Sequence, residues 1–267
     1  MLMKKGVTTM KIMMISIFLL FTYSSMTVAE TESTPRKELA IVIDDFGNDM
    51  KGTEEMLELP ISITAAIMPF LSTTSRDAKL AHEKGHEVIV HLPMEPKNGK
   101  KSWLGPGAIT TDLSDKEVRE RVEKAIEAVP FAVGMNHHMG SKVTEDERIM
   151  RIVLEVCKEK GFYYLDSKTT SKSVVGKIAD ELSVPHLENN LFFDHIYTEQ
   201  YINKQALSLM EQLNESEQLI AIGHVGITGE KVADVLKAYI PQYEKQAEIV
   251  PLSTLIPGSE MIDKSLP

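Results

Sequence analysis

Aspartate and histidine residues recur directly after short apolar segments of this chain. Asp44 and Asp45 follow the apolar run 39–43, and later runs are followed by His91, His137 and His138, Asp166, Asp194 and His195, and His224. Carboxylate oxygens and imidazole nitrogens together are typical ligands of a Zn²⁺-like divalent ion. Such an ion lowers the pKa of a bound water to about 7, and a nearby carboxylate that does not bind the ion can take the proton. These residue types therefore predict a metal site with hydrolytic chemistry.

The pair Asp44 and Asp45 places two negative charges side by side at the end of an apolar run. Consecutive side chains of a strand point to opposite faces, so the two carboxylates are not expected to do the same work. We expect one of them to bind the ion and its neighbour to act as the base. The positive charge of the ion would then compensate the negative charge of the pair.

The apolar runs alternate with amphipathic segments, a pattern typical of βα units around a parallel sheet. Strands are expected at 39–44, 61–67, 86–91, 131–135, 162–165, 190–193 and 218–222, with a weaker one at 247–250. Helices are expected at 74–84, 115–128, 145–160, 199–213 and 230–240. Two helix starts carry capping boxes, Ser114 with Glu117 and Thr144 with Glu147, and Pro241 is expected to end the last helix. The Asp and His residues named above then lie at the carboxyl ends of strands, where parallel βα folds build their active sites.

The fold class expected is α/β, with one domain. No GxGxxG sequence follows the first strand and no GxxxxGK[ST] loop occurs in the chain, so a nucleotide-binding doubly wound sheet is disfavoured. An irregular (β/α) barrel fits the pattern better. The segment 92–113 is rich in Gly, Pro and Lys and contains the only tryptophan, Trp103. We expect this segment to be a loop that overhangs one end of the barrel.

The first 29 residues have the pattern of a secretory signal peptide. Lysines precede an apolar run at 12–21, and small residues lead to a cleavage site near Ala29. An uncleaved N-terminal membrane anchor is the alternative. A polar tether at 30–37 would join the signal to a domain at 38–267. We therefore expect an exported protein, with no other contact to a membrane.

The net charge argues against polyanionic partners, and the cysteine content excludes an internal disulfide. The net charge is −10 and becomes more negative without the lysines of the signal, which argues against nucleic acid or an anionic membrane surface as a partner. The single cysteine, Cys157, cannot form an internal disulfide and is expected to be a core residue. The oligomeric state stays open.

Five segments, in order, resemble the divergent polysaccharide deacetylases: IVIDDFG, GHEVIVHLPMEP, VGMNHHMGS, YLDSKT and IAIGHVG. The resemblance extends over about residues 38–255. It implies a distorted (β/α)7-type barrel and export from the cytoplasm. The implied activity is that of an N-deacetylase that acts on an acetylated amino-sugar polysaccharide. The implied cofactor is a divalent metal ion, for which we favour Zn²⁺.

The resemblance also implies roles for single residues. The active deacetylases carry the motif Thr-Phe-Asp-Asp-Gly on the first strand, and this chain matches it with Phe46 inserted before Gly47. By this match, Asp44 corresponds to the catalytic base and Asp45 to a metal ligand. His91 corresponds to a second ligand. His224 corresponds to the acid that protonates the leaving amine, and Asp166 is the expected partner of His224.

The third metal ligand is where the chain departs from the active deacetylases. Glu95 stands where their second metal histidine stands, and their Arg-Pro motif has no counterpart. We favour His138 as the third ligand, with His137 and Glu95 as alternatives. These departures also suit a non-catalytic envelope protein that binds a glycan or a partner protein. Another metal-dependent hydrolase, such as a phosphoesterase, is disfavoured by the acidic surface. Trp103 could stack on a sugar ring or anchor its own loop.

Overall fold

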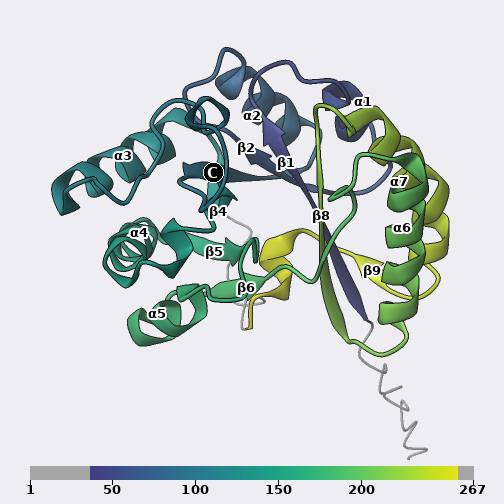
Figure 1. The fold of residues 1–267 in the computed structure, drawn as a ribbon. Helices are drawn as coiled ribbons and strands as arrows, with labels where there is room; N and C mark the ends of the chain where they lie inside the picture. Colours follow the sequence, from purple (N-terminus) through teal and green to yellow (C-terminus); the bar gives the residue numbers. More distant parts are fainter. Residues whose placement is uncertain (1–36, 258–267) are drawn as a thin grey trace, which may run out of the picture. The chain divides into compact units, whose positions relative to one another are not determined.

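A curled, all-parallel sheet forms the centre of the fold (Figure 1). The computed structural model describes residues 37–257, so the expected signal at 1–29 lies outside the described residues. The strands follow the order β6-β5-β4-β3-β2-β1-β8-β7, and β9 pairs with β1. Their bounds are β1 Glu38–Phe46, β2 Thr64–Ile67, β3 Glu87–Met94, β4 Ala132–Met139, β5 Tyr163–Asp166, β6 His186–Glu188, β7 Leu191–Phe192, β8 Gln218–His224 and β9 Glu248–Ile249.

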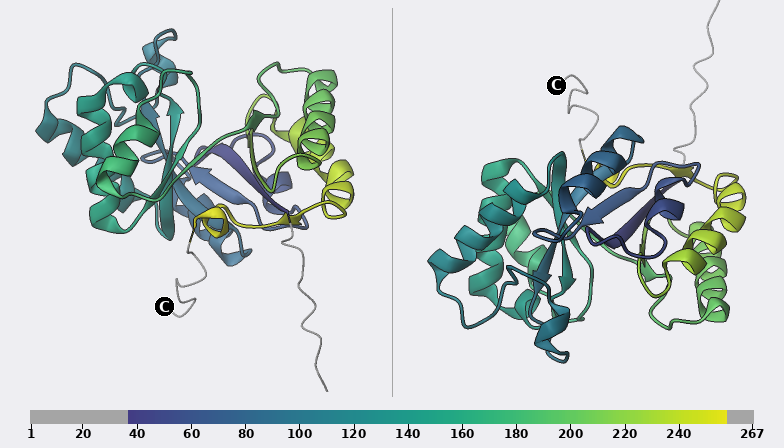
Figure 2. Two further views of the ribbon diagram at one scale, coloured as in Figure 1. Left: turned by 90° about the horizontal axis from the view of Figure 1, so that it is seen from below. Right: turned by 90° about the horizontal axis from the view of Figure 1, so that it is seen from above.

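Helices cover the outer face of this sheet (Figures 1 and 2). The helices α2, α3, α4 and α5 pack beside β2 to β6, and α6 and α7 pack beside β7 and β8. Their bounds are α1 Thr53–Leu57, α2 Thr74–Glu83, α3 Asp115–Ala128, α4 Glu147–Lys160, α5 Val175–Leu182, α6 Glu199–Leu213 and α7 Gly229–Tyr243, with short 3-10 turns η1 Lys101–Trp103, η2 Val143–Glu145 and η3 Leu252–Leu255. No helix within residues 37–257 is long and apolar enough to cross a membrane.

Strand β1 is buried on both faces, which explains its unbroken apolar sequence. Leu39, Ile41 and Ile43 belong to the core between sheet and helices, whereas Ala40 and Val42 belong to a second apolar cluster inside the curl of the sheet. This inner cluster includes Leu252 and Leu255 of η3.

The turn η3 closes the amino end of the curled sheet. The amide of Leu252 donates a hydrogen bond to the hydroxyl of Thr64, the first residue of β2. The amide of Ser253 donates to the carboxylate of Glu87, the first residue of β3. The amino end is thus plugged by the chain itself, and the opposite, carboxyl end is left for the polar residues of the site.

The expected α/β barrel is confirmed in a distorted form, because β6 and β7 are the two ends of the strand order and are not neighbours in it. All the strands and helices expected from the sequence are present, and α1, α5 and β6 are additional. The capping box at Ser114 and Glu117 is confirmed.

Two expected helix boundaries were wrong. Asp146, not Thr144, caps α4, because its side chain accepts the hydrogen bond from the amide of Ile149. The hydroxyl of Thr144 instead donates to the carbonyl of Gly140. The last helix passes through Pro241 and ends at Tyr243, whose buried hydroxyl donates to the carbonyl of Ala206.

Candidate metal centre

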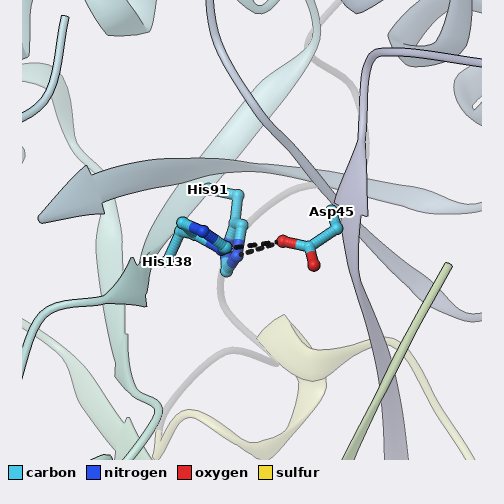
Figure 3. A group of neighbouring side chains, drawn as sticks. All are labelled: Asp45, His91 and His138. Carbon is cyan, nitrogen blue, oxygen red and sulfur yellow. Dashed lines mark ion pairs between the residues drawn. The ribbon is translucent and has the colours of Figure 1, made fainter. Parts of the chain in front are cut away.

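Three side chains from three strands meet at the carboxyl end of the sheet (Figure 3). The Oδ1 atom of Asp45 on β1 lies 2.8 Å from Nδ1 of His138 on β4 and 3.2 Å from Nε2 of His91 on β3. One ligand atom from each residue lies within 4.8 Å of the other two. One carboxylate and two imidazoles in this arrangement fit a divalent ion such as Zn²⁺, with a position left for water or substrate.

The polar atoms that face this centre lack other partners. Within residues 37–257, Asp45 Oδ1 and His91 Nε2 are buried atoms that make no hydrogen bond. Leaving a buried polar atom without a partner is costly, so such atoms call for an explanation. A cation held between them would satisfy both lone pairs at once. The residues present therefore fit a divalent ion on grounds of their own geometry.

The outer nitrogen of each imidazole makes a hydrogen bond that aims the inner nitrogen at the centre. His138 Nε2 lies 3.1 Å from the carbonyl oxygen of Trp103, and His91 Nδ1 lies 2.6 Å from the side-chain oxygen of Asn136. Each outer nitrogen donates its proton to an oxygen, so His138 presents Nδ1 and His91 presents Nε2 as acceptors. Trp103 thus contributes its backbone to the centre, and its indole is more than half exposed.

Backbone geometry at Asp45 brings both aspartates to the same side of the sheet. Asp45 has φ 73°, in the left-handed region, and the register of β1 with β2 shifts between Ile43 and Phe46. This irregularity breaks the alternation of the strand at Asp45. The expectation that Asp44 and Asp45 point to opposite faces was wrong, because both carboxylates approach His91, at 3.7 Å and 3.2 Å from its two nitrogens. If Asp45 binds the ion and Asp44 acts as the base, both carboxylates reach the centre only because of this irregularity.

The Asp45 carboxylate is held in its ionised form. Burial alone would raise its pKa, but the close imidazoles of His138 and His91 keep the pKa of Asp45 well below its usual range. In the same centre, the carboxylates of Asp44 and Asp45 raise the pKa of His91 against the opposing effect of burial. The centre is therefore an electrostatically coupled group of acids and imidazoles.

The two alternative ligands, Glu95 and His137, are engaged elsewhere. The carboxylate of Glu95 accepts hydrogen bonds from Lys142 at 2.8 Å and from the amide and hydroxyl of Thr111, both at 2.9 Å. The buried ring of His137 lies 3.2 Å from Asp166 through Nε2 and 3.0 Å from the carbonyl of Met139 through Nδ1. The geometry thus favours His138 as the third ligand.

The acid that contacts His224 is Asp194, not Asp166 as expected. Asp194 Oδ1 lies 2.8 Å from Nδ1 of His224, whereas Asp166 lies against His137. Burial alone would raise the pKa of Asp166, but hydrogen bonds, chiefly from His137, lower it. Sheet order explains the difference. Asp194 lies two residues after β7, the neighbour of β8, whereas Asp166 ends β5 on the other side of β1.

Asp44 lies next to His224 and is almost completely buried. The two residues are register partners on the neighbouring strands β1 and β8. The side-chain amide of Asn136 donates a 2.8 Å hydrogen bond to Oδ1 of Asp44. Asn136 was missed in the sequence, although its place two residues before His138 on one strand was a usable signal, because such residues share a face.

Residues 41–256 match the family described as divergent polysaccharide deacetylase. The chain belongs to this family. A Haemophilus influenzae (strain Rd) protein described as uncharacterized is 33% identical over 192 residues, which cover 72% of this chain and 68% of that protein. The uncharacterized protein YibQ of Escherichia coli K12 is 33% identical over 187 residues, 70% of this chain and 58% of YibQ. The chain thus spans less than two thirds of YibQ.

Solved structures share the fold of this chain. The uncharacterized protein ATU2773 from Agrobacterium tumefaciens C58 superposes with a TM-score of 0.77 at 20% identity, over 84% of this chain and 91% of that one. The Bc1960 peptidoglycan N-acetylglucosamine deacetylase superposes with a TM-score of 0.53 at 16% identity, over 82% of this chain and 87% of that one. These likenesses show a polysaccharide deacetylase fold.

Proposed function

We propose that this protein is a divalent-metal-dependent N-deacetylase that acts on an acetylated amino-sugar glycan outside the cytoplasm. The observation that carries the proposal is the group of possible metal ligands Asp45, His91 and His138. Asp44 lies next to this group, and the hydrogen-bonded pair of His224 and Asp194 lies beside Asp44. Family membership and the similarity to a peptidoglycan N-acetylglucosamine deacetylase support the substrate class. The signal-like segment at 1–29 supports export.

Asp45, His91 and His138 would hold the ion. When bound, a Zn²⁺-like ion supplies Lewis-acid chemistry, because it makes water more acidic and polarises a carbonyl. Zn²⁺ suits one carboxylate with two imidazoles, and the residues that orient the two imidazoles are in place. The ion would also compensate the charge that Asp44 and Asp45 gather at the end of β1.

Asp44 and His224 would transfer the two protons of the reaction, Asp44 as the base and His224 as the acid. Asp44, which does not belong to the ligand group, would accept the proton of the attacking water. His224 would give a proton to the nitrogen of the amino sugar as the amide bond breaks. The carboxylate of Asp194 keeps His224 protonated for this task, because the pKa of His224 is raised to about 10 even though burial opposes the charge. His224 thus carries the charge that a proton donor needs.

The test is acetate release from acetylated chitin oligomers and peptidoglycan fragments by the zinc-loaded protein. Wild-type protein is expected to release acetate, and Asp44→Asn is expected to lose about 10²- to 10⁴-fold in kcat, the usual contribution of a general base. Asp44→Asn should still bind the metal, because Asp44 is not a ligand. Tight glycan binding without acetate release, equal in both proteins, would instead indicate a non-catalytic binding protein.

A further inference from the structure

Asn136 bridges two residues of the proposed reaction from a fully buried position on β4. Its side-chain oxygen lies 2.6 Å from Nδ1 of His91, and its side-chain nitrogen donates to Oδ1 of Asp44 at 2.8 Å. Its partners are distant in the sequence and lie on β3 and β1. One amide thus connects a metal ligand with the proposed base.

The polarity of the amide fixes where the proton of His91 sits. The NH₂ group of Asn136 faces Asp44, because its nitrogen donates the 2.8 Å hydrogen bond to Oδ1 of Asp44. The carbonyl oxygen of Asn136 then faces His91 and can only accept, so Nδ1 of His91 must carry the proton. Nε2 of His91 is left with its lone pair toward Asp45 and His138, as a metal ligand needs.

The amide also separates His91 from Asp44. The two side chains are 3.7 Å apart at their nearest charged atoms, and both are almost completely buried. Without the amide, a small shift would let His91 Nδ1 donate directly to Asp44. The Asp44 carboxylate would then be hydrogen-bonded to His91, and it would be less free to accept a proton from water.

We propose that Asn136 is a positioning residue that fixes the Nδ1–H form of His91 and keeps the Asp44 carboxylate free of a direct pair with it. This inference rests on the proposed function for the role of Asp44, whereas the proton position on His91 stands independently of any activity. Asn136 lies within the segment VGMNHHMGS, but the family resemblance gave it no role and it is not one of the metal ligands.

The test compares three proteins labelled with ¹⁵N-histidine and loaded with Zn²⁺: wild type, Asn136→Leu and Asn136→Asp. Nitrogen NMR should show a slowly exchanging proton on Nδ1 of His91 in wild type. Asn136→Leu removes both hydrogen bonds, so this proton should exchange faster and Zn²⁺ should bind about 10- to 100-fold more weakly, the usual cost of losing such an outer partner. Asn136→Asp keeps an acceptor for His91, so the proton should stay on Nδ1 and the metal affinity should be retained, whereas kcat should fall.

Thr64→Val is the matched control for a general loss of packing. Thr64 is fully buried and makes two side-chain hydrogen bonds at the opposite end of the sheet, so its variant should leave the His91 signal and the Zn²⁺ affinity unchanged. A wild-type His91 with its proton on Nε2 overturns the inference without any variant. An unchanged His91 signal in Asn136→Leu, with acetate still released by wild type, overturns it while sparing the proposed function. Failure of wild type to release acetate, with the His91 signal responding as expected, leaves the proton position established and removes only the proposed reaction.

Discussion

Nδ1 of His224 lies 2.8 Å from Oδ1 of Asp194, whose carboxylate accepts three hydrogen bonds. The second oxygen, Oδ2, accepts hydrogen bonds from the hydroxyl of Thr228 at 2.6 Å and from the amide of His224 at 3.2 Å. Asp194 is buried and therefore held in one orientation. The imidazole of His224 is thereby fixed next to Asp44 at the carboxyl end of the sheet.

The pair makes stability depend on pH in the alkaline range. The pKa of His224 is about 10 in the folded protein against an ordinary 6.5, because the attraction of Asp194 outweighs burial. A raised pKa means that the folded state holds the proton more tightly than the unfolded state. The contribution to stability is complete below pH 6.5 and is lost as the pH rises through about 10. Denaturant unfolding of the metal-free protein between pH 6 and pH 10 measures this loss, and a contribution that grew over the range would contradict the pairing.

Replacing the acid separates Asp194 from Asp166 as the partner of His224. Asp194→Asn should lower the pKa of His224, because a neutral amide does not stabilise the imidazolium. Asp166→Asn is the matched control, since Asp166 lies against His137. Histidine NMR titration of both variants gives the answer. A pKa of His224 that falls in Asp166→Asn and not in Asp194→Asn would refute the assignment.

The choice of the third metal ligand also has a direct test. His138→Ala should weaken Zn²⁺ binding strongly, since it removes a nitrogen that lies 2.8 Å from Asp45 Oδ1. Glu95→Gln should leave the affinity nearly unchanged, because Lys142 and Thr111 already occupy the carboxylate. Calorimetric titration with Zn²⁺ measures both. The reverse order of effects would make Glu95 the ligand.

The turn η3 should contribute to stability through the apolar cluster inside the sheet. Leu252→Ala is expected to destabilise the fold by about 2–5 kcal/mol, the usual cost of truncating a fully buried leucine. Leu207→Ala on α6 is the control, because this leucine is half exposed. Urea unfolding compares the two. Equal effects would mean that the inner cluster does not support the sheet.

The gathering of polar residues at one end could be predicted from the sequence for a simple geometric reason. All strands of a parallel sheet present their carboxyl ends at the same edge, so residues that follow apolar runs converge there. His91, His138 and Asp45 belong to the set found in this way, and the family resemblance led to their choice as the metal ligands. The order of the strands is not encoded in any single run, which is why Asp166 and Asp194 could not be told apart as partners of His224.

Other features depend on the tertiary structure alone. The left-handed backbone of Asp45 is unusual for a residue other than glycine, and no local pattern signals it. The hydrogen bonds of Asn136 span 45 and 92 residues of sequence. Helix α7 passes Pro241 because that residue lies in its exposed last turn, where only one backbone hydrogen bond is lost, and Tyr243 anchors the end.

The metal content of the purified protein is the most direct test of the account. Wild-type protein incubated with Zn²⁺ and freed of excess ion is expected to retain an equimolar amount, and His91→Ala is expected to retain almost none. His186→Ala is the matched control, because this histidine lies on β6 outside the centre, and it should bind as wild type does. Zinc retained equally by wild type and His91→Ala, or by neither, would contradict a metal centre at Asp45, His91 and His138.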